Sequence, residues 1–377
     1  MRKCVSALVV LALSQFGCAE KPAESQSGET SDVLLVHGKW IQESAGGVMA
    51  DPQTSGLSHW RGQLVSISDG SGQSSQRRKL HMINPETSTL APAPQAMTMA
   101  SAVRRSCFAQ YLSDEPDLEA VVVDPQDDTI FYTVTEDATR SGALSERCQQ
   151  QFENTGSTDY PTLLVRIKRE ESGKAVMTHV RPVQFPTQYE VGDFPNDGIE
   201  GLAISQDKLL YLGLEKDAKG QPRIFTVQLD DEFWQKKGFA VVSDPKLKVP
   251  TFASGNHPIN GLEYYFDKTN AKGYVLAAAR NDNQLWVIDA TSASDTVVVD
   301  MQFSADVGDA VGQCETPEIM DNASIEGVAV IGDTLWLVND PWKKNYLKNI
   351  KCPSLAESYK AMAPLLFSTP LNPDWFQ

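Results

Sequence analysis

The sequence predicts an all-β chain that forms a single five-bladed β-propeller, and three observations lead to this fold class. Short runs rich in β-branched and aromatic residues, bounded by Gly, Pro, Asn and Asp, recur along the 377 residues. One arrangement recurs in several segments: a polar residue after an apolar one, a β-rich run, a turn and a longer β-rich run. Helical periodicity is nearly absent, apart from one short helix expected near residues 354–363.

The recurring arrangement is clearest at residues 197–217, where an acid, Glu200, stands at the start of an apolar strand. When the segments are aligned on the polar residue, five residues occupy the same position: Ser58, Glu119, Glu200, Asn260 and Glu326. The intervals are 61, 81, 60 and 66 residues, each long enough for about four strands with their loops, which is one propeller blade. A six-bladed ring is the alternative, because 81 residues is generous. The Cys-containing insertion at 140–161 explains that interval more simply.

The two ends of the chain also fit a closed ring. The β-rich run at 363–371 supplies a third strand to the last blade, which then lacks an outer strand. The run at 32–42, near the N-terminus, is expected to take that place. Joining the first and last blades in this way removes the exposed edges that an open sheet would leave.

The first residues are typical of an export signal. Arg2 and Lys3 precede an apolar run, Val5 to Leu13, that is too short to span a bilayer. The pair Gly17-Cys18 resembles the lipobox of bacterial lipoproteins, although Gln15 stands where Leu or Val is usual.

We therefore expect a signal peptide at 1–17, a lipidated Cys18 with a flexible tether at 18–31, and the propeller at 32–377. An ordinary cleaved signal peptide is the alternative. Ala19 is not the aspartate associated with inner-membrane retention, so we expect an outer-membrane lipoprotein that faces the periplasm or the cell surface.

The cysteine count agrees with export. If Cys4 leaves with the signal and Cys18 carries lipid, four cysteines remain, and three pairings of them are open: Cys107, Cys148, Cys314 and Cys352. An even number in an exported protein suggests disulfides, and pairing sequence neighbours gives Cys107–Cys148 and Cys314–Cys352. No CxxC is present, which argues against a zinc site.

The charge restricts the partners. A formal net charge of −16 argues against a nucleic acid polymer, and we expect a monomer that binds a small molecule. In a propeller the innermost strands start at one level around the channel, so the aligned residues Ser58, Glu119, Glu200, Asn260 and Glu326 should face one another.

Carboxylates gathered in this way repel, and a hard cation such as Ca²⁺ compensates them through oxygen ligands. All the aligned residues are oxygen donors, and none is His or Cys. The alternative is structural, with each Glu accepting backbone N–H bonds at a strand start.

The repeated Glu-Gly-Leu/Val-Ala at 200–203 and 326–329 is similar to bacterial phytase-like propellers, the family described as having esterase-like activity of phytase. More distantly, the order Ser58, Glu119, Glu200, Asn260, Glu326 resembles the central calcium ring of the calcium-activated nucleotidases (apyrases), which are five-bladed propellers. There the fourth position is typically a hydroxyl residue, so Asn260 departs from the pattern. The resemblance implies a propeller with a channel calcium and hydrolase activity.

The second strands all end in polar residues that should cluster at one end of the channel. Arg280 and Lys216 are candidates for binding a phosphoryl charge, and Glu136 or Asp340 for positioning water. The alternative is that these residues only form turns.

The function that we expect is an exported calcium-dependent hydrolase of phosphoesters or nucleotides. The alternative is a non-catalytic binding propeller with structural calcium. A third option, a lactonase-type reaction, would use His257 near the metal as proton carrier.

Overall fold

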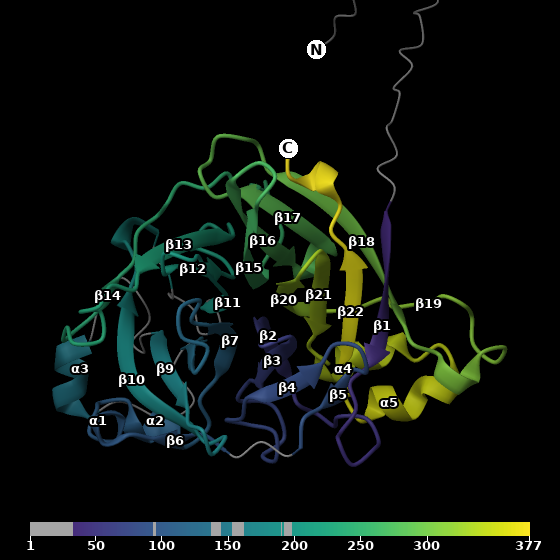
Figure 1. The fold of residues 1–377 in the computed structure, drawn as a ribbon, viewed down its shortest axis with the longest axis horizontal. Helices are drawn as coiled ribbons and strands as arrows, with labels where there is room; N and C mark the ends of the chain where they lie inside the picture. The colour runs from purple at the N-terminus through teal and green to yellow at the C-terminus, as the bar shows by residue number, and fades with distance from the viewer. Residues whose placement is uncertain (1–32, 93–95, 137–144, 153–161, 190, 192–197) are drawn as a thin grey trace, which may run out of the picture. The chain divides into compact units, whose positions relative to one another are not determined.

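The computed structural model describes residues 33–92, 96–136, 145–152, 162–189, 191 and 198–377. The expected signal peptide, Cys18 and the tether lie outside these residues. The described chain is built from short strands with a few short helices (Figure 1). In this part of the chain no helix is long and apolar enough to cross a membrane.

The strands form successive antiparallel groups in chain order. The first is β2 (Thr54–Trp60), β3 (Gln63–Ser68), β4 (His81–Asn84) and β5 (Thr89–Leu90), and the second is β7 (Leu118–Val123), β8 (Ile130–Thr135), β9 (Leu163–Arg169) and β10 (Ala175–Gln184). The third is β11 (Ile199–Ile204), β12 (Leu209–Leu214) and β13 (Arg223–Gln228). The fourth is β15 (Ile259–Asp267), β16 (Lys272–Ala279), β17 (Gln284–Asp289) and β18 (Val297–Ala305). The last begins with β20 (Ile325–Ile331), β21 (Thr334–Asn339) and β22 (Leu365–Pro370).

Short elements complete the edges. Two-residue strands β6 (Thr98–Met99), β14 (Ala240–Val241) and β19 (Glu318–Ile319) add to the outer strands β10 and β18. The α-helices are α1 (Ser101–Arg104), α2 (Ala109–Ser113), α3 (Glu146–Phe152), α4 (Lys343–Tyr346) and α5 (Ala356–Lys360). The last of these confirms the short helix expected near 354–363.

The N-terminal strand closes the ring, as expected from the sequence. β1 (Leu34–Trp40) pairs antiparallel with β22, with His37 opposite Ser368 and Trp40 opposite Leu365. The same strand pairs parallel with β18 of the preceding group. In Figure 1 this purple strand lies beside the yellow β22, so the two ends of the propeller chain meet in one sheet.

The first strands of the groups surround the centre. Each packs beside the first strand of the next group, in the order β2, β7, β11, β15, β20, and β20 packs beside β2. This circular order, with each group running outward as a meander, is the architecture of a β-propeller.

Small residues allow the first strands to approach so closely. A Cβ on Gly327 of β20 would lie 2.8 Å from the carbonyl carbon of Gly56 in β2, and a Cβ on Gly56 would lie 2.6 Å from the nitrogen of Val121. Atoms do not approach this closely, so glycine is required there. This explains why a glycine follows the polar residue in the Glu-Gly-Leu/Val-Ala pattern.

The apolar core lies between neighbouring groups of strands. One cluster joins the fourth and last groups through residues such as Val287 and Phe367, and another joins the first and second through Val65 and Phe131. Disulfides link Cys107 to Cys148 and Cys314 to Cys352, which confirms the pairing of sequence neighbours.

Candidate functional site

The polar residue of the recurring arrangement occupies a β-bulge. In β11, Ile199 pairs with Leu214 and Gly201 with Gly213, so Glu200 between them has no partner in the ladder. The same offset occurs at Glu119, Asn260 and Glu326 in β7, β15 and β20. A bulge re-aims the extra side chain, and bulges are frequent beside functional sites. The repeated acid is therefore an inserted residue directed out of the regular alternation.

In the first group the equivalent residue is Ser55, because the packing of Gly56 against β7 matches that of the glycines that follow Glu200 and Glu326. The Ser55 hydroxyl donates to Glu119 Oε2 at 3.2 Å. Ser58, which the sequence alignment placed here, lies three residues further along β2, and its hydroxyl accepts a bond from the backbone N–H of Val123. We call the set Ser55, Glu119, Glu200, Asn260 and Glu326 the first ring.

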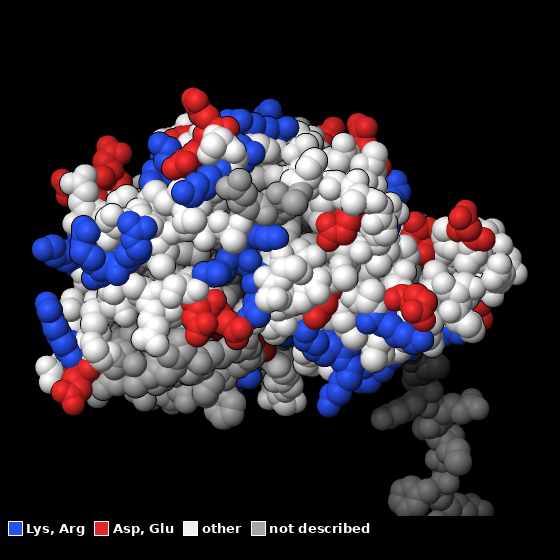
Figure 2. Space-filling model, turned by 90° about the horizontal axis from the view of Figure 1, so that it is seen from below, with Lys and Arg blue, Asp and Glu red and all other residues white. Residues whose placement is uncertain are grey.

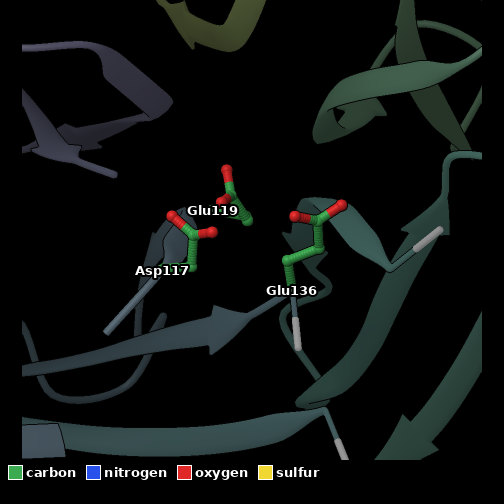
Figure 3. A group of neighbouring side chains, drawn as sticks. All are labelled: Asp117, Glu119 and Glu136. Atoms are coloured by element: carbon green, nitrogen blue, oxygen red, sulfur yellow. The ribbon is translucent and has the colours of Figure 1, made fainter. Parts of the chain in front are cut away.

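The three glutamates of the first ring meet. Glu119, Glu200 and Glu326 are all buried, and one carboxylate oxygen from each lies within 4.8 Å of the others. Two further groups of acids share these distances and overlap with the first: Asp117, Glu119 and Glu136, and Glu136, Glu200 and Glu215. Figure 3 shows Asp117, Glu119 and Glu136 directing their carboxylates toward a common space.

A second ring lies at the ends of the second strands. In each group the residue after that strand takes the equivalent place: Asp69, Glu136, Glu215, Arg280 and Asp340. The structure thus brings the predicted Glu136, Arg280 and Asp340 together with the first ring. Lys216 is not at this position: Glu215 is, and it shares the cluster of acids with Glu136 and Glu200.

Most members of the two rings border a cavity of about 280 Å³. Its walls carry acids from both rings together with Asp117, and two cations, Arg280 and Lys343. Gln53, Ser71 and Trp342 complete the lining.

Burial and mutual repulsion act on the carboxyl groups of this cavity in the same direction. Burial, with repulsion from Glu200 and Asp117, raises the pKa of Glu119 well above its usual value. Burial and the neighbouring Glu136 and Glu326 do the same to the pKa of Glu200. The cluster therefore favours protons on its acids unless a cation is present.

Among the other carboxyl groups of the two rings, Asp69 and Glu326 have smaller pKa shifts and Asp340 a larger one. Burial and the neighbouring Asp117 raise the pKa of Asp69 to about 6. Burial raises the pKa of Glu326 to about 7, against the opposing attraction of Arg280. Burial and repulsion from Glu326 and Asp69 raise the pKa of Asp340 well above its usual value.

Arg280 is the cation within the rings. Its Nη1 donates to Glu326 Oε1, and its guanidinium lies 5.6 Å from the centre of the Trp342 ring. Burial alone would lower the pKa of Arg280, but Glu326 and Glu200 outweigh it, so the pKa is raised and the charge is kept.

Several buried polar atoms of the two rings have no hydrogen-bond partner among the described residues. Asn260 is 0% exposed, and neither its Oδ1 nor its Nδ2 is hydrogen-bonded. Arg280 Nε, Asp340 Oδ1 and Glu215 Oε2 share this property. A buried polar group without a partner is costly, so such a concentration points to a ligand that supplies the partners.

His257 lies away from this centre. Its Nδ1 is 2.8 Å from Asp282 Oδ1, its ring stacks on Phe252 at 3.5 Å between centroids, and it is absent from the described cavity lining. The structure therefore does not place it as a proton carrier beside the acids, and the lactonase option loses its histidine.

Two residues of the site, Ser55 and Asp117, were missed in the sequence, whereas Asp69 and Glu215 belong to the polar strand ends that were expected to cluster but were not assigned a role. Ser55 had a usable signal, because Gly56 follows it as Gly201 and Gly327 follow Glu200 and Glu326. Glu215 immediately precedes Lys216 in the same strand end, and only the strand register distinguishes the two.

The outer surface differs from the cavity. Figure 2 shows one face of the molecule, where Lys and Arg side chains lie among Asp and Glu and neither sign covers the face. The gathering of carboxylates is thus a property of the channel and is not repeated on this face.

Residues 53–341 match the family model described as phytase-like, esterase-like activity of phytase. The chain belongs to this phytase-like family. The match begins at Gln53 and ends at Pro341, and in the structure Gln53 Nε2 donates to the Pro341 carbonyl at 3.0 Å. The matched part of this phytase-like protein thus contains both rings, while the closing strands β1 and β22 lie outside it. The resemblance to the calcium-activated nucleotidases is not confirmed.

Comparison with the curated proteins finds no match. Among solved structures, the phytase-like chain is similar to an exo-β-1,3-galactanase from Phanerochaete chrysosporium, with 10% identity, a TM-score of 0.44, and coverage of 89% of this chain and 64% of that one. An exo-β-1,3-galactanase from Clostridium thermocellum shows 12% identity and a TM-score of 0.48, with coverage of 89% of this chain and 62% of that one. The allergen Mala s 1 of Malassezia sympodialis shows 7% identity and a TM-score of 0.45, with coverage of 85% of this chain and 94% of that one. The phytase-like chain spans less than two thirds of the length of either galactanase.

Proposed function

We propose that this phytase-like protein is a five-bladed propeller that hydrolyses phosphoesters or nucleotides in its central cavity, with Ca²⁺ held by the first ring. The observation that carries the proposal is the bulged ring of buried acids, which converges with Asn260, whose two side-chain polar atoms lack partners. Family membership supports a hydrolase as the class of activity.

The donor set fits a calcium ion. Glu119, Glu200 and Glu326 offer carboxylate oxygens within 4.8 Å of one another, and Ser55 and Asn260 offer a hydroxyl and an amide oxygen. Calcium takes six to eight such oxygens, whereas zinc and copper prefer the nitrogen and sulfur ligands that neither ring contains. A divalent cation would also relieve the repulsion that raises the pKa values of these acids.

When bound, the cation would polarise a phosphoryl oxygen and offset its negative charge. The chain's own residues then have separate tasks. Arg280 binds the phosphoryl group through Nε, the guanidinium donor that has no partner among the described residues. Asp340, which lines the cavity and whose Oδ1 has no hydrogen-bond partner among the described residues, holds the attacking water, and Glu136 lines the same cavity.

We further propose that the protein is an exported monomer, anchored in the outer membrane through Cys18 and facing the periplasm or the cell surface. The two disulfides support an oxidising compartment. Mass spectrometry of the membrane fraction would test the anchor, because a Cys18→Ser variant should lose the lipid mass and leave the membrane.

The activity is tested by phosphate release from nucleotides and phosphomonoesters, in Ca²⁺ and in chelator, with the chain from residue 33. Glu200→Gln is the test variant, and Asp230→Asn, an exposed acid paired with Lys236, is the matched control. We expect turnover that requires Ca²⁺, falls at least about 100-fold in Glu200→Gln and is unchanged in the control. Calcium binding without turnover, in a folded protein, would replace the hydrolase with a binding propeller in which calcium is structural.

A further inference from the structure

A short segment directly after the second ring brings an aromatic side chain to the cavity. Trp342 follows Asp340 and Pro341, lines the cavity, and is 45% exposed. Large apolar side chains exposed to this degree are few among the described residues. An exposed indole in the wall of a polar cavity is a surface on which a ligand can stack.

The backbone holds this indole in a strained, tightly bonded turn. The N–H of Trp342 donates to the carbonyl of Asp340 at 2.8 Å, and the N–H of Lys343 donates to the carbonyl of Pro341. Lys343 has a φ of 42°, a left-handed conformation that is unfavourable for a residue with a Cβ. Strain of this kind persists where the surroundings fix it, and it is concentrated at ligand sites.

Contacts from residues just before β2 and just after β3 fix the turn. Gln53 Nε2 donates to the Pro341 carbonyl at 3.0 Å. Lys343 Nζ lies 3.0 Å from Asp51 Oδ1 and 3.1 Å from the Ser71 carbonyl. The backbone on both sides of Trp342 is therefore held before a ligand arrives, which reduces the entropy lost on binding.

Arg280 links the indole to the reacting centre. Its guanidinium lies 5.6 Å from the Trp342 ring centre, and its buried Nε has no hydrogen-bond partner among the described residues. A buried guanidinium donor of this kind calls for an anionic acceptor. A hydrogen-bond donor for an anion and a stacking surface thus lie side by side in one wall of the cavity.

We propose that Arg280 and Trp342 together select phosphoesters whose leaving group is a ring, with the phosphoryl oxygen on Arg280 Nε and the ring face against the Trp342 indole. This inference rests on the proposed function and names its substrate class. The leaving alcohol carries either an aromatic ring, as a phenol or a nucleoside does, or a sugar ring, because an aromatic face and the C–H face of a sugar can both pack on an indole. Esters of short acyclic alcohols have nothing to place on the indole and are poor ligands.

The test compares phenyl phosphate, glucose 6-phosphate and ethyl phosphate in Ca²⁺, in wild type, Trp342→Ala and Trp342→Phe. Phe266→Ala is the matched control, because Phe266 is also 45% exposed but is absent from the described cavity lining. We expect Trp342→Ala to lower kcat/KM about tenfold for one or both ring esters and less than twofold for ethyl phosphate. Trp342→Phe should restore most of the loss, and Phe266→Ala should change none of the values. Which ring ester responds distinguishes the aromatic from the sugar ligand.

Binding of the same esters, measured by calorimetry, separates this inference from the proposed hydrolysis. If wild type hydrolyses none of them but binds a ring ester at least fivefold more tightly than ethyl phosphate, and Trp342→Ala loses that preference, the ring site stands and the hydrolase fails. Equal losses for ring and acyclic esters, or no ring preference in wild type, would overturn the ring site even if turnover is observed. A circular dichroism spectrum equal to that of wild type shows that each variant is folded.

Discussion

Asp124 and the glutamates of the first ring are buried acids with opposite surroundings. Asp124, in the turn between β7 and β8, accepts hydrogen bonds from Tyr132 Oη at 2.6 Å and from the backbone N–H of Gln126 at 2.9 Å. Lys208 Nζ lies 2.9 Å from the same carboxylate. Burial alone would raise the pKa of Asp124, but these contacts outweigh burial and the pKa is lowered.

Glu119 and Glu200 are also buried, and burial together with repulsion from neighbouring acids, which no donor or cation offsets as at Asp124, raises their pKa values well above the usual range. The difference is instructive. A chain that needs a buried acid for stability gives it donors and a cation, as it does at Asp124. The first ring instead gathers acids on inserted residues, which destabilises the fold unless a cation binds there. The following predictions test this contrast, from the largest expected effect to the smallest.

The largest effect is on the pH dependence of stability. A carboxyl group whose pKa is raised in the folded state binds its proton more tightly there than in the unfolded chain, so stability falls as pH rises between the two pKa values. For Asp69 these are 3.8 and about 6, and for Glu326 they are 4.5 and about 7. Each shift corresponds to about 3 kcal/mol.

Urea unfolding from pH 5 to 8, in chelator and in Ca²⁺, measures this effect. We expect the stabilisation by Ca²⁺ to grow with pH by at least about 3 kcal/mol, because the cation keeps the acids ionised. The difference between the free energies of unfolding in Ca²⁺ and in chelator excludes the contribution of His81. Burial lowers the pKa of His81 to about 4, and its effect on stability is the same in both solutions. A stabilisation by Ca²⁺ that does not change with pH would contradict the view that the cavity acids, unlike Asp124, need a cation to be ionised.

The second effect concerns Asp124, the buried acid that donors and a cation stabilise. Asp124→Asn removes the charge that Lys208 and Tyr132 contact, and leaves these partners without an anion. We expect a loss of about 2 kcal/mol in the free energy of unfolding, equal in Ca²⁺ and in chelator. A loss that depends on Ca²⁺ would connect Asp124 to the cavity and remove it as a reference.

The third effect has the opposite sign. In chelator at pH 8, Glu200→Gln removes one of the repelling acids while it keeps the size of the side chain. We expect the free energy of unfolding to rise by at least about 1 kcal/mol. In Ca²⁺ the variant should be less stable than wild type, because a ligand is lost. Destabilisation in both solutions would mean that Glu200 is a structural residue like Asp124.

The smallest effect distinguishes two serines. Ser55→Ala removes a neutral oxygen from the first ring and should weaken Ca²⁺ binding a few-fold in calorimetry, about 1 kcal/mol. Ser58→Ala removes the acceptor of the Val123 N–H and should reduce stability slightly while Ca²⁺ affinity is unchanged. The reverse result would restore Ser58 as the ligand.

The sequence allowed much of the fold to be predicted, because the strand pattern is local and recurs. The sequence alignment correctly made four residues equivalent: Glu119, Glu200, Asn260 and Glu326. The pairing of sequence neighbours in the disulfides and the closing strand β1 were also predicted correctly. The alignment of the first group was wrong because Ser58 follows the apolar Leu57, as the pattern requires, whereas Ser55 follows Thr54. Only the close approach of Gly56 to β7 identifies the correct one.

The site was harder to predict than the fold. Asp69 belongs to the polar ends of the second strands, which were expected to cluster, but Asp117 comes before a first strand, and no repeat identifies it. The place of Asp117 depends on how neighbouring groups of strands pack, which the sequence does not display. The bulge that turns Glu200 out of the ladder was also invisible, because an inserted residue has no marker of its own.

The position of β1 has a consequence for the order of folding. The strand is synthesised first, yet its partners are β18, which starts at Val297, and β22, which ends at Pro370. The ring therefore cannot close until nearly the whole chain has emerged, and its last contacts join residues more than 260 positions apart, such as Leu34 and Met301. Pairings between such distant residues form slowly. Until they form, β18 and β22 present open edges, so the period between synthesis and closure is when this protein is most exposed to aggregation.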